Sequence, residues 1–136
     1  MSQGDLILLV EDNEANTILA TAVLQRDGFG VEVASSAEEA RERLRGTTPE
    51  LILMDLQLPG EDGLAFTREL KADPVTAGIP IVALTAHAMA GDRERVIEAG
   101  CAGYVSKPID TRTFSRQVRE LLEGFRANAR EEGVAS

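Results

Sequence analysis

Three short apolar runs stand out along the chain, and in none of them do polar residues alternate with apolar ones. They are Leu6–Val10, Leu51–Met54 and Ile81–Leu84. A strand with one solvent-facing side alternates, so these continuous runs predict strands that are covered on both sides, as in a parallel sheet. Two weaker candidates, Gly30–Ala34 and Gly103–Ser106, bring the expected number of strands to five.

A helical pattern follows each predicted strand. Asp12 or Asn13 can cap the first helix and Gly28 can end it, whereas Ser36 and Glu39 have the spacing of a capping box. The predicted helices cover about residues 14–27, 36–45, 62–72 and 88–99, and from 110 toward 130. The fourth has few apolar residues, so we expect it to pack loosely. The last carries an apolar stripe that can lie on the sheet: Phe114, Val118, Leu121, Leu122 and Phe125.

Strict alternation of strand and helix predicts a doubly wound α/β fold, in which helices cover both faces of a five-stranded parallel sheet. The length of 136 residues fits one domain. We expect that domain to cover residues 1–123, and residues 124–136 to form a C-terminal helix extension and flexible tail. Such folds bind ligands beyond the carboxyl ends of the strands, so functional residues are expected at that edge.

Acidic, hydroxyl and amine side chains follow the predicted strands. Glu11 and Asp12 end the first strand, Asp55 the third and Thr85 the fourth, and Lys107 follows the fifth. Three carboxylates at one edge repel one another and need more positive charge than one lysine supplies. Oxygen ligands at this density favour a hard ion, usually Mg²⁺. A carboxylate beside a metal and a lysine is also suited to attack phosphorus.

The net charge of −9 comes from 23 acidic and 14 basic residues. It repels nucleic-acid phosphates and anionic lipids, so we expect neither nucleic acid nor membrane as a direct partner. Residues 1–62 hold 13 of the acidic and 4 of the basic residues, whereas the rest of the chain is neutral. The sequence shows no leader and no membrane-length apolar run, and its one cysteine, Cys101, fits a reducing compartment. We therefore expect a cytoplasmic protein.

Taken in order, these residues resemble the receiver domain of two-component response regulators, the CheY-like family. The resemblance is highly specific and spans about residues 5–123. It is carried by Glu11-Asp12-Asn13, Leu53-Met-Asp55-Leu-Gln-Leu-Pro59, Gly63, Thr85-Ala86, Tyr104 and Ser106-Lys107-Pro108. The first of these motifs, together with Asn16 and residues 85–92, looks most like single-domain regulators of the DivK kind and the receivers of hybrid kinases.

The resemblance implies a flavodoxin-like (βα)5 fold in which Asp55 is the phosphoacceptor. The phosphoryl group would come from a phosphohistidine of a sensor histidine kinase or a histidine phosphotransfer protein. Mg²⁺ would be bound directly by Asp12 and Asp55, through water by Glu11, and by the backbone carbonyl of Gln57. The chain would not otherwise be an enzyme, beyond its own phosphorylation and slow autodephosphorylation.

The resemblance also implies a conformational switch. Thr85 would hydrogen-bond one phosphoryl oxygen and Lys107 would pair with another, while Tyr104 turns inward as Thr85 moves. Phosphorylation adds a group of about −2 charge, which would shift the surface around the fourth and fifth helices. The expected result is altered binding to a downstream protein partner, with the chain acting as a monomer or as a phosphorylation-dependent dimer.

Each of these residues also has a purely structural interpretation. Asp12 could cap a helix, Asp55 could form a turn, Thr85 could simply end a strand, and Lys107 could be a solvated residue before a proline. Tyr104 could be an ordinary half-buried aromatic. In the family, side chains at the positions of Gln57 and His87 modulate access of water to the phosphoaspartate, and that role is left open here. The isomer of the Lys107–Pro108 bond is also left open.

Two other functions stay open at this point. One is a phosphorelay intermediate that passes its phosphoryl group to a histidine phosphotransfer protein. The other is a phosphatase with an aspartyl-phosphate intermediate, although Gln57 stands where such enzymes place an acidic residue. The glycine-rich segments 28–33 and 59–63 lack the dinucleotide and P-loop patterns, so nucleotide binding is not expected.

Overall fold

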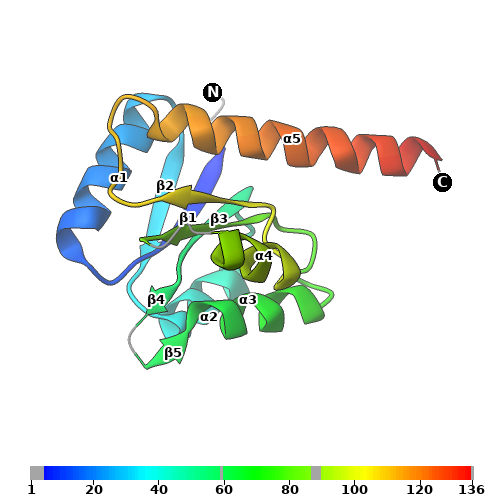
Figure 1. Ribbon diagram of the computed structural model, residues 1–136, viewed down its shortest axis with the longest axis horizontal. Helices are drawn as coiled ribbons and strands as arrows, with labels where there is room; N and C mark the ends of the chain where they lie inside the picture. Colours follow the sequence, from blue (N-terminus) through cyan, green and yellow to red (C-terminus); the bar gives the residue numbers. More distant parts are fainter. Residues whose placement is uncertain (1–4, 59, 87–89, 136) are drawn as a thin grey trace.

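Five parallel strands form one sheet in the computed structural model, which describes residues 5–58, 60–86 and 90–135 (Figure 1). The strands of this sheet are β1 (Leu6–Val10), β2 (Gly30–Ala34), β3 (Leu51–Asp55), β6 (Ile81–Thr85) and β7 (Gly103–Ser106). The helices are α1 (Glu14–Arg26), α2 (Ala37–Gly46), α3 (Gly63–Ala72), α4 (Ala90–Glu98) and α5 (Phe114–Ala135). The predicted fold class is confirmed.

The strand order is β2-β1-β3-β6-β7, and each neighbouring pair is parallel. The order reverses at β1, which pairs with β2 on one side and with β3 on the other. Val10 is aligned with Met54, so the residues that follow them, Glu11 and Asp55, lie side by side at the carboxyl ends of β1 and β3. This is the point at which doubly wound folds bind their ligands.

Successive residues of each strand enter two different cores. Ile7 and Leu9 pack on the face that α1 and α5 cover, whereas Leu8 and Val10 pack on the face covered by α2, α3 and α4. Figure 1 shows α5 on the opposite side of the sheet from α2 and α3. Because both faces of the central strands are buried, β1 is apolar throughout and β3 and β6 are apolar up to their last residue, which explains the missing alternation in the sequence.

The predicted helix starts are confirmed for the first three helices. Asn13 caps α1 by accepting a hydrogen bond from the N–H of Asn16. Ser36 accepts one from the N–H of Glu39 at the start of α2. Asp62 does the same for α3.

Two differences from the sequence prediction concern the start of the last helix and the segment that follows β3. The last helix begins at Phe114 instead of Asp110, because residues 110–113 form a turn whose Asp110 carbonyl accepts hydrogen bonds from Thr113 and Phe114. A short antiparallel hairpin of β4 (Gln57–Leu58) and β5 (Glu61–Asp62) follows β3 and was not predicted. The start proposed for the fourth helix, residue 88, lies outside the described residues.

Helix α5 runs past the sheet to Ala135 (Figure 1). Phe114, Val118 and Leu122 of its predicted stripe are buried against the sheet. Farther along, Arg126 pairs with Asp5 at 2.9 Å and with Glu50 at 2.8 Å. The extension beyond residue 123 is therefore helical, whereas the flexible tail stays a prediction. Within the described ranges, no helix combines the length and the apolar character needed to cross a membrane.

The Cys101 thiol lies in the core, and its burial raises its pKa to about 11, although Thr67 and Lys71 oppose the shift. At pH 8 we expect it to react with a disulfide reagent roughly 100-fold more slowly in the native protein than in guanidinium, because the thiolate is the nucleophile. The contribution of this thiol to stability is full below about pH 9.0 and is lost as the pH rises through about 11. Equal rates of reaction of the Cys101 thiol in the native and in the unfolded protein would contradict the raised pKa.

Candidate functional site

Three carboxylates meet at the carboxyl ends of β1 and β3. Oxygen atoms of Glu11, Asp12 and Asp55 all lie within 4.8 Å of one another. Lys107 follows β7, and its Nζ lies 3.1 Å from Oδ1 of Asp55 and 3.5 Å from Oε1 of Glu11. The sheet therefore brings the four charged residues that the sequence singled out to one place.

Burial makes this cluster of like charges unfavourable without a cation. Glu11 and Asp55 are each 2% exposed, whereas Asp12 is exposed. Burial raises the pKa of Glu11, the neighbouring Asp55 carboxyl raises it further, and the Lys107 ammonium lowers it. Oε1 of Glu11 accepts no hydrogen bond from the described residues, although the Lys107 ammonium lies 3.5 Å away, and a buried carboxylate oxygen without a hydrogen bond is costly. An oxygen-binding divalent cation would satisfy this oxygen and neutralise its neighbours.

The backbone after Asp55 folds closely around the carboxylate. The N–H of Gln57 donates to Oδ1 of Asp55 at 3.0 Å. Gly63, the first residue of α3, donates its N–H to the carbonyl of Leu56. A Cβ on Gly63 would lie 2.7 Å from both the Asp55 carbonyl oxygen and Leu56 Cα, so the close approach requires glycine.

Thr85 ends β6, next to the strand that carries Asp55. It is 6% exposed, and its carbonyl accepts a hydrogen bond from the N–H of Lys107 at 2.8 Å. Thr85 also lines a cavity of about 180 Å³ together with Gln57, Asp62 and Val96. The cavity therefore lies between the β4–β5 hairpin and α4.

Tyr104 lies half-buried on β7 and contacts α4. Its hydroxyl accepts a hydrogen bond from Nε of Arg93 at 3.1 Å, and the guanidinium lies 5.6 Å from the ring centroid. Sequence reasoning selected Tyr104 but missed Arg93. The sequence of a charged helix does not indicate which of its exposed arginines contacts a side chain of another element.

The structure excludes two of the purely structural interpretations, Asp12 as the cap of α1 and Lys107 as a solvated lysine. Asn13, not Asp12, caps α1, so the Asp12 carboxylate is left to the cluster. The Lys107 side chain is 17% exposed and ion-paired, which excludes a freely solvated lysine. The peptide bond between Lys107 and Pro108 is cis. His87 lies outside the described residues.

The geometry can be compared with known proteins. A model of the response regulator receiver domain matches residues 7–119. The chain belongs to this family. Among curated relatives, the polar-differentiation response regulator DivK of Brucella ovis is 40% identical to this receiver domain over 116 residues, which are 85% of this chain and 94% of that protein.

Solved receiver domains have the same fold. The receiver domain of the sensor histidine kinase PA1611 from Pseudomonas aeruginosa has a magnesium ion coordinated in its active-site cleft. It matches with a TM-score of 0.78 and 36% identity, over 88% of this chain and 98% of that one. The chemotaxis response regulator CheY4 of Vibrio cholerae, at 21% identity, matches with a TM-score of 0.82 over 88% of this chain and 99% of that one. Receiver domains bind Mg²⁺ at an acidic pocket, and this receiver has an acidic cluster at its strand ends.

Proposed function

We propose that this receiver domain is a phosphorylation-dependent switch and that Asp55 is its phosphoacceptor. One observation carries the proposal: the buried Asp55 carboxylate lies 3.1 Å from Lys107 and shares that lysine with Glu11, while Asp12 completes the cluster. A structural ion pair would match one carboxylate with one cation. Three carboxylates around one ammonium instead favour a site that takes up more positive charge when it works.

The donor set fits Mg²⁺, the cation of this family. Asp12 and Asp55 would hold the ion directly, Glu11 through water, and the Gln57 carbonyl would complete the set that the protein supplies. The buried Oε1 of Glu11, which accepts no hydrogen bond from the described residues, supports this assignment because it could accept one from a water on the ion. When bound, Mg²⁺ offsets the negative charge that develops on a transferring phosphoryl group.

An oxygen of the Asp55 carboxylate would attack the phosphorus of a phosphohistidine on a kinase or phosphotransfer protein. A P–O bond to Asp55 forms as the P–N bond breaks, and the electron pair leaves with the imidazole. Lys107, already 3.1 Å from Oδ1, is placed to pair with a phosphoryl oxygen, and the Thr85 hydroxyl would donate a hydrogen bond to another.

The new phosphoryl group, of about −2 charge, would then bias the packing of α4. This helix buries Val96 but leaves Ile97 51% exposed, so few apolar contacts hold it. The cavity beside Thr85 offers room for that side chain to move. Tyr104 would turn inward in response, and the surface around α4 and α5 would change its affinity for a downstream protein.

Incubation with Mg²⁺ and acetyl phosphate tests this function. We expect incorporation of a single phosphoryl group that requires Mg²⁺ and is prevented by chelation, with beryllofluoride binding at the same site. A protein that incorporates nothing under these conditions would contradict the proposal. Rapid, repeated turnover of phosphomonoesters would instead indicate a phosphatase.

The alternatives differ in what happens after phosphorylation. A phosphatase needs a general acid near the leaving group, and Gln57 has no acidic proton to supply. We therefore propose that the chain acts only on itself. Transfer onward to a histidine phosphotransfer protein stays a prediction, as do the oligomeric state and the cytoplasmic location.

Replacing Lys107 with alanine is expected to permit phosphorylation but to blunt the conformational response. The ammonium is the one positive side chain paired with Asp55 among the described residues, so its loss removes the contact that couples the phosphoryl oxygens to β7. Tyr104 is the only tyrosine in a sequence without tryptophan, so intrinsic emission reports on it alone. Beryllofluoride should change this emission in the wild type and change it much less in Lys107→Ala.

Tyr104→Phe, which removes the emission, serves as the blank for that measurement. Retention of the full wild-type change in Lys107→Ala would overturn the coupling role of Lys107.

A further inference from the structure

The β4–β5 hairpin connects the proposed phosphoacceptor to α3. It begins two residues after Asp55, and Gln57 is paired with Asp62, the cap of α3. The Gln57 N–H also donates to Oδ1 of Asp55. Any displacement of the hairpin therefore moves both a donor to the Asp55 carboxylate and the backbone carbonyl proposed to face the metal ion.

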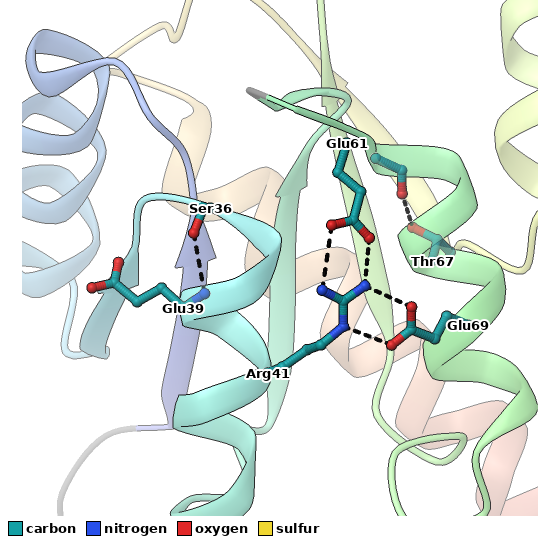
Figure 2. A network of polar contacts seen from close by, with 7 residues as sticks. Ser36, Glu39, Arg41, Glu61, Thr67 and Glu69 are labelled. Atoms are coloured by element: carbon teal, nitrogen blue, oxygen red, sulfur yellow. Dashed lines mark hydrogen bonds and ion pairs between the residues drawn. The ribbon is translucent and has the colours of Figure 1, made fainter.

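Arg41 of α2 is ion-paired with Glu61 of β5, the other strand of this hairpin (Figure 2). Its guanidinium donates through Nη1 and Nη2 to the two carboxylate oxygens of Glu61. It also donates to Glu69 of α3, from Nε and from Nη2, each at 2.7 Å. The same group lies 4.7 Å from the centroid of the Phe66 ring. Bidentate pairing on two sides with an aromatic face fixes the position of this guanidinium far better than a single exposed ion pair would.

The helix that carries Arg41 is itself firmly anchored. Ala37 and Ala40 of α2 are buried against the sheet. Within the hairpin, Leu58 is paired with Glu61 and is 8% exposed. Arg41 therefore connects α2, which is packed against the sheet, to β5, the strand that pairs with Gln57 and Leu58.

We propose that Arg41 is a positioning residue, which fixes the β4–β5 hairpin against α2 and α3 and so holds the Gln57 backbone at Asp55 for Mg²⁺ binding. This inference rests on the proposed function of Asp55. It gives a role to an arginine that contacts none of the four charged residues of the site. The role depends on the several N–H donors of the planar guanidinium, so a lysine at position 41 should not be able to perform it.

The protein contains a matched control. Arg126 also pairs with two carboxylates outside its own helix, Asp5 and Glu50, and with Glu123 one turn earlier on α5. Its side chain is 30% exposed against 33% for Arg41. Asp5 and Glu50 precede β1 and β3, so they lie at the opposite edge of the sheet from Asp55. Arg126→Ala therefore removes a comparable network without touching the hairpin.

The experiment compares the full-length wild type with Arg41→Ala, Arg41→Lys, Glu61→Gln and Arg126→Ala. Amide exchange of Gln57 is measured by NMR in metal-free protein, and Mg²⁺ affinity is measured from amide shifts during titration. Phosphorylation by acetyl phosphate is measured against Mg²⁺ concentration, and urea unfolding shows that each variant is folded.

In Arg41→Ala we expect faster exchange at Gln57 and Mg²⁺ binding weakened by roughly 3- to 10-fold, below the 10- to 100-fold typical of direct partners of metal ligands. Saturating Mg²⁺ should restore the phosphorylation rate. Arg41→Lys and Glu61→Gln should behave like Arg41→Ala, whereas Arg126→Ala should change stability but neither Mg²⁺ affinity nor Gln57 exchange.

Wild-type exchange and Mg²⁺ affinity in folded Arg41→Ala would overturn the positioning role. Equal losses of Mg²⁺ affinity in Arg41→Ala and Arg126→Ala would also overturn it, because the effect would then follow general stability. If the wild type itself binds no Mg²⁺, the proposed function fails, and Gln57 exchange in the metal-free variants alone decides whether Arg41 holds the hairpin.

Discussion

Asp55→Asn is expected to lose phosphorylation by acetyl phosphate almost completely, with a fall of about 1,000-fold or more, as when enzymes lose their nucleophile. The carboxylate oxygen forms the new bond to phosphorus as acetate leaves, and a neutral amide is a far poorer nucleophile. The fold should survive, because one of two buried carboxylates that share Lys107 is neutralised while the Glu11 partner remains. Phosphoryl incorporation and urea unfolding measure the two effects.

Asp62→Asn is the matched control for this charge change. Asp62 lines the cavity beside Thr85 and caps α3, and asparagine caps helices about as well as aspartate does. We expect this variant to be phosphorylated at close to the wild-type rate. Substantial phosphorylation of Asp55→Asn at any other residue would show that the phosphoacceptor is wrongly assigned.

Gly63→Ala is expected to have the second largest effect, because it damages both stability and the site. The added Cβ would meet two backbone atoms, the Asp55 carbonyl oxygen and Leu56 Cα, each at 2.7 Å. Backbone atoms cannot swing aside as a flexible side chain can, so the residues around the phosphoacceptor must shift. We expect a loss of roughly 1–3 kcal/mol in the free energy of unfolding, the usual cost of overpacking, together with slower phosphorylation.

Gly124→Ala separates this close contact from the general effect of replacing a helical glycine. A Cβ on Gly124 would meet nothing within 4 Å, and alanine favours a helix over glycine by about 0.5–1 kcal/mol. Urea unfolding should therefore show Gly124→Ala to be at least as stable as the wild type. If Gly63→Ala matched it in stability and in phosphorylation rate, the close approach at Asp55 would not be essential.

The fold could be predicted because its signals are local. Ile7 to Val10 are apolar on both faces of a strand that two helical layers cover, and Asn13, Ser36 and Asp62 mark helix starts by their side-chain chemistry. The charged cluster followed from the same logic, because parallel strands end at one edge and place Glu11 beside Asp55. Strand order alone then brings residues that are far apart in the sequence together.

The contacts that were missed depend on tertiary geometry. Arg41 and Arg93 lie on helices whose sequences are mostly charged. In such a sequence, an arginine that binds a hairpin or a tyrosine cannot be told from an arginine that only contacts solvent. The β4–β5 hairpin has only two residues in each strand, too few for a period to appear. The choice between Asp12 and Asn13 as the cap of α1 depends on which oxygen faces the N–H of Asn16, which spacing alone does not determine.

The most direct test of the central claim identifies the modified residue. The protein is incubated with Mg²⁺ and acetyl phosphate, the acyl phosphate is reduced with borohydride, and the product is mapped by mass spectrometry. Reduction of a phosphorylated aspartate gives homoserine, so the account predicts homoserine at position 55 and at no other aspartate, and none when Mg²⁺ is chelated. Homoserine at another position, or an unmodified Asp55 in protein that carries phosphate, would contradict it.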